Sequence, residues 1–257
     1  MKQQEIFLCL ALLLFANTLP AQDTLKNSDV YPSGISLKYG FGKYSVKDQY
    51  ISDEKYSGNM PEYSIAWARK HNKYVYRLEA AVRLSEEITN YNVSTNITQV
   101  KFGHGFLYPL KKLSLFNRDL FIWLGPSTQF FFYVNEPRIS VDGFDYAQSF
   151  AGLFSIGFNI EAIYPLSRTF FVETSLDLTP LSVGIHIVDS EEDDQSPVKP
   201  VTLLSGLNSS FDFGFRYFLL KKLSFRLEYK FEFTRISAWD PLLSASDNMV
   251  IGMTYGF

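Results

Sequence analysis

The chain has 257 residues, of which 46% are hydrophobic, 17% aromatic and 20% charged. This composition excludes a disordered chain, which needs low hydrophobicity and high charge, and 15 glycines are too few for collagen. The formal net charge of −3 gives no indication of a surface that binds nucleic acid, and the sequence contains no motif for it.

Residues 1–21 are predicted to be a secretory signal peptide that is cleaved after Ala21. Lys2 gives a positive start, and the apolar run Ile6–Phe15 is too short to cross a bilayer as a helix. Cys9, the only cysteine, lies inside this run. The mature chain would therefore have neither disulfides nor thiolate metal ligands.

Beyond the signal, apolar and polar residues alternate with a period of two, which is typical of β-strands with one apolar face. Ten predicted strands follow one another: Ile35–Phe41, Glu62–Trp67, Tyr74–Leu84, Val100–Tyr108, Leu120–Val134, Gln148–Tyr164, Phe170–Leu178, Leu207–Leu219, Ser224–Thr234 and Met249–Phe257. The segment Leu120–Val134 is apolar on both faces and gives no clear phase, so eight strands remain an alternative.

The connections between these strands alternate in length. Short ones are predicted near His71–Lys73, Lys111–Arg118, Leu166–Arg168 and Leu220–Leu223. Long polar ones are predicted at Lys47–Asn59, Glu86–Asn96, Asn135–Ala147, His186–Leu204 and Ser237–Asp247. We therefore expect a single domain at residues 22–257, in which residues 22–32 form a short periplasmic lead too small for a plug domain.

Alternating strands suit either a soluble barrel or sandwich with an apolar core, or a membrane barrel with an apolar exterior. Three features favour the membrane: many aromatic residues on the apolar faces, strands longer than those of soluble sheets, and long connections that alternate with short ones after an export signal. The prediction is an all-β fold, a transmembrane antiparallel up-and-down β-barrel of ten strands. Closure into a barrel also leaves no unpaired sheet edge in hydrocarbon.

The chain resembles the outer-membrane β-barrel proteins of Gram-negative bacteria. Its LPAQ signal end and YPL turns are similar to those of small Bacteroidetes-type barrels, and its MTYGF end, with Tyr255 and Phe257, is similar to the signal read by the barrel-assembly machinery. The resemblance implies a multi-pass protein in contact with outer-membrane lipid and lipopolysaccharide, with short turns in the periplasm and long loops outside. It does not fix an activity, because such barrels serve as anchors, adhesins, enzymes and narrow channels.

Charged residues on the polar faces are predicted to form a network in the lumen. Its members are Arg77, Glu79, Arg83, Glu161, Glu173, Asp177, Asp212, Arg216, Arg226, Glu228, Lys230 and Glu232. With Lys70, Lys101 and Glu62 they make seven cations and eight anions. In so narrow a barrel, near-balanced charges are expected to pair and fill the lumen. A conducting pore, the alternative, would be expected to carry an excess of one sign.

Other candidate sites carry weaker signals. His186 and Asp189 near the outer rim would suit a hydrolase, but a solvated loop histidine is the competing interpretation. His104, between two glycines on the nominal lipid face, suggests a β-bulge, and His71 falls in a short turn. The acidic run Ser190–Asp194 suits either Ca²⁺ or solvent. We predict no cofactor and no metal site.

Aromatic residues in or beside the long connections suit either a partner-binding surface or an outer membrane girdle. They are Tyr44, Tyr50, Tyr56, Tyr91, Phe144, Tyr146 and Trp239. The sequence thus favours a non-enzymatic barrel with a filled lumen and a structural or surface-binding role through its outer loops, with an unknown surface ligand or protein partner. A narrow channel for small solutes and a rim hydrolase are the alternatives.

Overall fold

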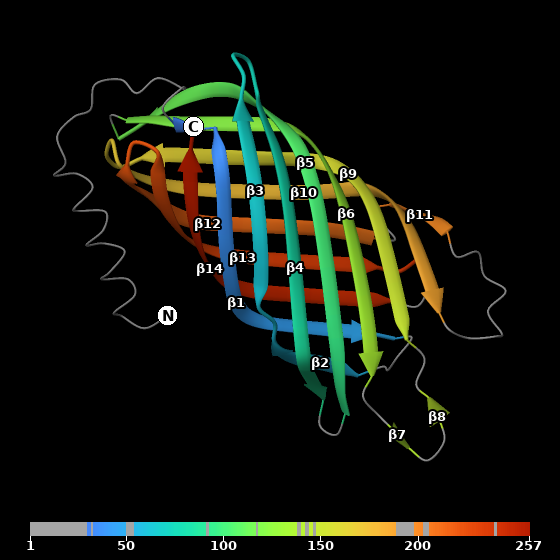
Figure 1. The fold of residues 1–257 in the computed structure, drawn as a ribbon. Coiled ribbons are helices and arrows are strands. Elements are labelled where there is room, and N and C mark those ends of the chain that lie inside the picture. Colours follow the sequence, from blue (N-terminus) through green and yellow to red (C-terminus); the bar gives the residue numbers. More distant parts are fainter. Residues whose placement is uncertain are drawn as a thin grey trace.

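The alternating segments of the sequence form long antiparallel strands in the computed structural model of the protein (Figure 1). The structure describes residues 30–31, 33–49, 54–90, 93–116, 118–137, 140–141, 144–145, 148–188, 198–202, 206–238 and 241–257. The predicted signal peptide lies outside these residues. Within them, no helix combines the length and the hydropathy needed to cross a bilayer.

Fourteen strands are assigned along the described residues. They are β1 (Gly34–Asp48), β2 (Lys55–Asn59), β3 (Glu62–Lys70), β4 (Val75–Asn90), β5 (Val93–Leu115), β6 (Arg118–Pro137), β7 (Ser140–Val141), β8 (Phe144–Asp145), β9 (Ser149–Pro165), β10 (Phe170–Val188), β11 (Val198–Thr202), β12 (Gly206–Leu220), β13 (Leu223–Ile236) and β14 (Leu242–Gly256).

Ten long strands close into a ring. β2 and β3 pair with successive parts of β1, and β11 and β12 with successive parts of β10, so each couple acts as one interrupted strand. The ring closes where β14 pairs with β1, from Gly34 opposite Gly256 to Asp48 opposite Leu242. The prediction of ten strands is confirmed, and the eight-stranded alternative is wrong.

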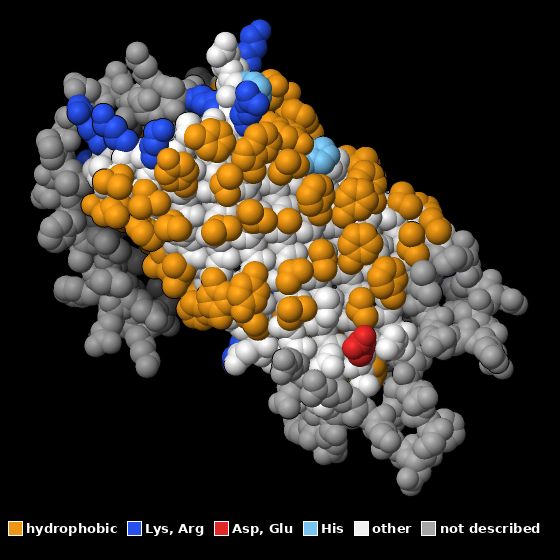
Figure 2. Space-filling model, viewed as in Figure 1, with side chains coloured by type: hydrophobic (Ala, Val, Ile, Leu, Met, Phe, Trp, Pro, Cys, Tyr) orange, Lys and Arg blue, Asp and Glu red, His pale blue; other side chains and the backbone are white. Residues whose placement is uncertain are grey.

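The two faces of the ring differ sharply in polarity. Phe213, Phe231 and Ile251 are 41%, 36% and 52% exposed on the exterior, whereas Arg216 and Glu228 are only 1% and 8% exposed. Figure 2 shows hydrophobic side chains spread over the visible outer wall. A soluble barrel would have the opposite arrangement, so the structure excludes it.

The strand Leu120–Val134, whose phase was unclear from the sequence, forms the centre of β6. Its odd-numbered residues point inward, among them Trp123 and Phe131, while Phe130 and Phe132 lie on the exterior. Apolar side chains occur on both faces because the interior itself contains apolar layers at its two ends.

Several strands extend further than predicted. Most of Glu86–Asn96, expected to be a long loop, belongs to β4 and β5, which pair as far as Asn90 opposite Val93. Ile88 and Ile97, near this end, are fully buried. The alternation of polarity fades here, but burial of these two side chains inside the ring still holds the strands in place.

His104 does not mark a β-bulge, contrary to the prediction. It pairs in regular register with Leu78 and Thr128, and its ring lies on the exterior near Tyr76 and Phe106. Among the described pairings of β5, the register shifts fall elsewhere, between Ser85 and Ile88 on β4 and between Pro109 and Lys112. The glycines beside His104 are accommodated without an extra residue.

Closure of the ring predicts a specific cross-link. Replacing Tyr39 and Ile251 by cysteine should give a disulfide in nearly all molecules on mild oxidation, because directly opposed residues have Cα atoms about 4.5–5.5 Å apart. Non-reducing gel mobility measures it. Leu37→Cys with Met249→Cys, four residues out of register, should remain unlinked. Equal cross-linking of both pairs would contradict the closed register.

Candidate functional site

The interior of the barrel is the candidate functional site, and it is built in three layers. An apolar cluster fills each end, and charged side chains lie between them. The loop-end cluster consists of Tyr44, Val46, Tyr56, Met60, Ile88, Ile97, Phe131, Tyr133, Ala151, Leu153, Ile236 and Leu242. The turn-end cluster consists of Val30, Tyr31, Val75, Leu107, Phe121, Trp123, Ile163 and Phe171.

The lead before β1 contributes to the turn-end cluster. Val30 is fully buried, and its carbonyl accepts a hydrogen bond of 2.6 Å from Nη2 of Arg216. The ring of Tyr31 packs against Trp123 with centroids 5.6 Å apart. Burial raises the pKa of the Tyr31 hydroxyl, which therefore stays neutral at physiological pH. Val30 and Tyr31, which precede β1, thus help to fill this mouth.

The loop-end cluster contains two of the aromatic residues that the sequence placed beside the outer loops. Tyr44 and Tyr56 are 1% and 2% exposed inside the barrel, so they belong neither to a partner-binding surface nor to a girdle. The side chains of the other five, Tyr50, Tyr91, Phe144, Tyr146 and Trp239, are outside the described part of the structure. Near this end, the buried carboxylate of Asp48 accepts hydrogen bonds from Tyr133 at 3.3 Å and Asn135 at 3.2 Å.

Below the loop-end cluster lies the Arg83 group, formed by Arg83, Lys101, Lys230, Glu62 and Glu232. The Arg83 guanidinium contacts both carboxylates. Lys230 lies 2.8 Å from Glu62 and 3.2 Å from Glu232, and Lys101 lies 2.9 Å from Glu232. Each carboxylate therefore has at least two cationic partners, which offsets its removal from water.

Nearer the turn end lies the Arg226 group, formed by Lys38, Arg216, Arg226, Glu173 and Glu228. Arg226 bridges the two carboxylates, at 3.0 Å from Glu173 and 3.4 Å from Glu228. Arg216 lies 2.7 Å from Glu173, and Lys38 lies 3.0 Å from Glu228. The Arg216 guanidinium also stacks 5.1 Å from the ring centres of Phe171 and Phe218, so it joins this group to the turn-end cluster.

A third set, the Arg77 group, links β4 to β9 across the lumen. Arg77 contacts Glu161 directly and lies 3.2 Å from Glu79. Because β4 and β9 are not neighbours in the ring, this contact spans the interior and narrows any axial path.

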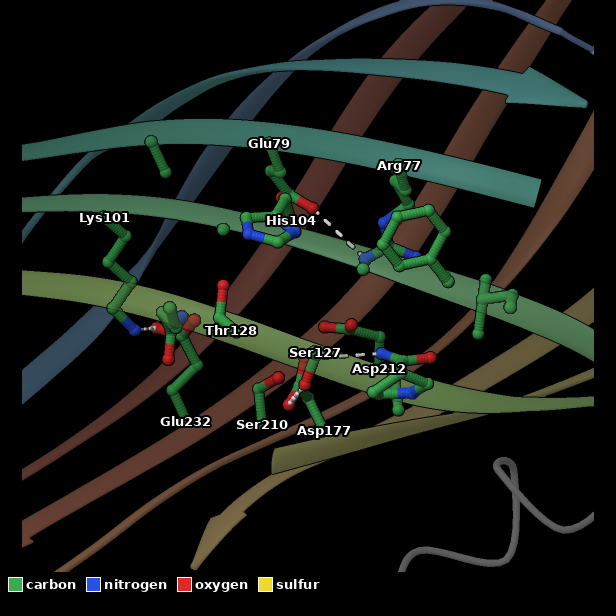
Figure 3. Close-up of a pocket in the computed structure, with 18 of the residues that line it drawn as sticks. Arg77, Glu79, Lys101, His104, Ser127, Thr128, Asp177, Ser210, Asp212 and Glu232 are labelled. Atoms are coloured by element: carbon green, nitrogen blue, oxygen red, sulfur yellow. Dashed lines mark hydrogen bonds and ion pairs between the residues drawn. The ribbon is translucent and has the colours of Figure 1, made fainter. Parts of the chain in front are cut away.

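Asp177 and Asp212 have no ion pair among the described side chains. Asp177 accepts hydrogen bonds from Ser127 at 3.1 Å and Asn159 at 3.4 Å, and Asp212 accepts one from Ser175 at 2.8 Å. Figure 3 shows both beside a cavity of about 80 Å³, which is also lined by Glu79 of β4, Lys101 of β5 and Glu232 of β13. A cavity of this size suits a few water molecules rather than an organic solute.

The structure brings together all twelve residues of the predicted lumen network. It adds Lys38, which the sequence count omitted, and moves Lys70 out of the lumen to the turn-end mouth. Because Lys38 alternates with the outward residues Ile35, Leu37 and Tyr39, its inward position could have been predicted from the sequence. The inward aromatic residues were harder to predict, because period-two alternation assigns apolar residues to the exterior. Strands that are apolar on both faces, such as Leu120–Val134, indicate where aromatic residues point inward.

Among the described residues, the remaining candidates form no second site. His186 lies in β10, but its side chain, Asp189 and Ser190–Asp194 are outside the described part of the chain. His71 stacks on Tyr74 at the β3–β4 turn, with ring centres 4.6 Å apart. Across the described residues, there is no group of three or more His, Cys, Asp or Glu side chains that would hold a metal ion.

The C-terminal residues Tyr255 and Phe257 lie on the exterior, 56% and 60% exposed. Figure 1 places the C-terminus at the end of the barrel that carries the short turns. Both side chains are therefore accessible at this end of the barrel.

Solved structures with a similar fold are outer-membrane barrels. The outer membrane protease OmpT from Escherichia coli is 10% identical, with 91% of this chain and 99% of that chain covered and a TM-score of 0.53. The translocator domain of the autotransporter NalP from Neisseria meningitidis is 10% identical, with 99% and 96% covered and a TM-score of 0.48. Neisserial surface protein A is 10% identical, with 87% and 97% covered and a TM-score of 0.40.

No protein-family model and no curated protein matches the sequence. At 10% identity, the likeness to OmpT establishes a shared fold and leaves the activity open. The chain therefore has the fold of an outer-membrane β-barrel.

The Arg83 group predicts a large loss of stability on removal of its central cation. Arg83→Met should lower the free energy of unfolding by about 3–5 kcal/mol, because it leaves two buried carboxylates short of a partner. Urea titration of the folded protein measures this. The matched control is Lys112→Gln, which removes an exposed pair 3.4 Å from Asp119 and should cost about 1 kcal/mol or less. Equal losses would show that the buried pairs add no stability beyond that of a surface pair.

Proposed function

We propose that the protein is an integral outer-membrane barrel with a closed interior, and that it acts as a structural or surface-binding protein rather than as a pore. The observation that carries this proposal is the lumen itself, in which cross-linked ion pairs lie between two apolar clusters. The Bacteroidetes-type resemblance, the cleaved signal peptide and the recognition of Tyr255 and Phe257 by the assembly machinery belong to the same proposal.

The exterior of the barrel supports the membrane location. On β13, the outward residues from Leu223 to Phe233 are apolar, and Arg235 follows them. At a rise of about 3.3 Å per residue and a tilt of about 40°, this stretch is about 25 Å tall, the height of the apolar band of outer-membrane barrels. On β1 and β14, the opposed pair Lys43 and Asp247 follows the apolar residues at the same end.

The interior supports a closed barrel. Ten strands enclose little more space than the eight that side chains can fill. The Arg77 group crosses this space, and the turn-end mouth is filled by Tyr31 and Trp123. Among the described inward side chains, seven cations face eight anions in the three ion-pair groups and their surroundings, and Asp48 adds one anion near the loop end, so little net charge is left to select an ion. With the lumen closed, interaction with the surroundings falls to the exterior and to the outer loops.

The membrane location predicts that charge is costly at mid-height on the exterior. Ile251→Arg should lower the free energy of unfolding in phospholipid vesicles by about 2–4 kcal/mol, whereas Leu220→Arg, at the turn end of β12, should cost about 0–1 kcal/mol. Denaturant titration followed by tryptophan fluorescence measures both values. Similar, small costs at both positions would contradict burial of the exterior in lipid.

The closed lumen predicts that the protein conducts no ions across planar bilayers. Purified barrels should give no steady single-channel conductance, because the ion pairs and both apolar clusters block the axis. Heat-modifiable gel mobility checks that the inserted protein is folded. A steady conductance that changes in Glu173→Gln or Arg226→Gln would overturn the closed-barrel proposal and favour a narrow channel instead.

A further inference from the structure

The four short turns carry basic side chains and no acidic ones. Between residues 70–74, 109–118, 165–170 and 220–223 the sequence has eight basic residues and no Asp or Glu. We call the seven whose side chains are described the basic collar: Lys70, Lys73, Lys112, Arg118, Arg168, Lys221 and Lys222. Asp119, just beyond the second turn, pairs with Lys112. The collar follows the turns β3–β4, β5–β6, β9–β10 and β12–β13, which are distributed around the ring.

The opposite end of the barrel has the opposite charge. The five long connections predicted from the sequence contain 15 Asp and Glu against 4 Lys and Arg. The overall net charge of −3 hides this separation along the barrel axis. The positive charge is therefore concentrated at the turn end of the barrel, where it would attract an anionic partner.

The collar lies at the edge of the apolar exterior. Next to its basic residues, Leu110, Phe116 and Leu220 are 58%, 74% and 63% exposed. Figure 2 shows Lys and Arg side chains gathered at the upper end of the view, directly beside hydrophobic ones. In a membrane, the position just beyond the hydrocarbon is that of the phosphate groups, and the apolar stems of Lys and Arg allow their charged ends to reach it.

We propose that the basic collar binds anionic phospholipids of the periplasmic leaflet through their phosphate groups. The inference rests on the proposed outer-membrane location. Ammonium and guanidinium groups form charge-assisted hydrogen bonds with phosphate oxygens, and a ring of them meets the lipid on every side of the barrel. The collar thereby holds the turn end at the headgroup level of one leaflet.

A soluble polyanion is the competing ligand. Lys70, Lys73, Lys221 and Lys222 also line a concavity of about 740 Å³ at the turn end, with Tyr31 and Trp123 among its lining. Lys112, Arg118 and Arg168 do not line it and lie on the other two turns. Lipid surrounds all four turns, whereas a ligand in this concavity would reach the basic side chains of only two of them, so the distribution of charge favours lipid.

The test compares two triple variants of the full mature chain. The collar variant is Lys73→Gln with Lys221→Gln and Lys222→Gln, and the control is Lys43→Gln with Lys47→Gln and Lys55→Gln at the loop end. Both lose three positive charges. The proteins are folded into vesicles of phosphatidylcholine with or without phosphatidylglycerol, and native mass spectrometry then measures the lipids that each protein retains.

The wild type and the control should retain phosphatidylglycerol in preference to phosphatidylcholine, and the collar variant should lose at least about tenfold of that preference. Equal retention by the collar variant and the control would overturn the proposal. So would displacement of the lipid from the wild type by a hexaglutamate peptide, which would assign the collar to a soluble acidic ligand.

Vesicle flotation and heat-modifiable mobility separate this inference from the proposed function. Folded, floating protein without a preference for phosphatidylglycerol overturns the lipid site alone. Protein that neither floats nor folds in vesicles overturns the membrane location, and the lipid site with it.

Discussion

The pairing of charges inside a closed ring is the constraint on which the structure depends. A ring of ten strands leaves little room for water, so an ionised side chain that points inward must find its counterion among the other inward side chains. The protein meets this demand by sharing: Glu232 contacts three cations and Arg226 two carboxylates. Asp177 and Asp212, which form no ion pair among the described side chains, accept hydrogen bonds from hydroxyl groups and, at Asp177, from an amide.

These pairs also join strands that do not neighbour one another. Lys230 on β13 contacts Glu62 on β3, and Arg77 on β4 contacts Glu161 on β9. Backbone hydrogen bonds fix each strand only to its two neighbours, whereas these two ion pairs join strands three positions apart in the ring. The apolar clusters then exclude water from both ends, which strengthens each pair by lowering the dielectric constant around it. The polar interior and the apolar exterior thus arise from the same alternation of side chains along each strand.

Much of this arrangement can be predicted from the sequence, because strict alternation determines both the strands and the side on which each residue lies. Segments such as Ser224–Thr234 give the phase without ambiguity, and the residues of the lumen network follow from it. Alternation fails where both faces are apolar. The inward positions of Trp123 and Phe131 depend on what fills the lumen at each depth, a property of the closed ring rather than of any single strand. Tyr44 and Tyr56 were misassigned for the same reason, since a tyrosine near a strand end is equally suited to a membrane interface and to an inner cluster.

The pairing of β14 with β1 has a consequence for biogenesis. Lys38 and Glu228, joined by an ion pair between β1 and β13, are 190 residues apart in the sequence. Contacts this distant form slowly, since a long loop must close before they are gained. Until the last strand has been exported, the growing sheet keeps two open edges and an apolar face, both prone to aggregation. The ring can therefore close only once the C-terminal strand is available to pair with β1.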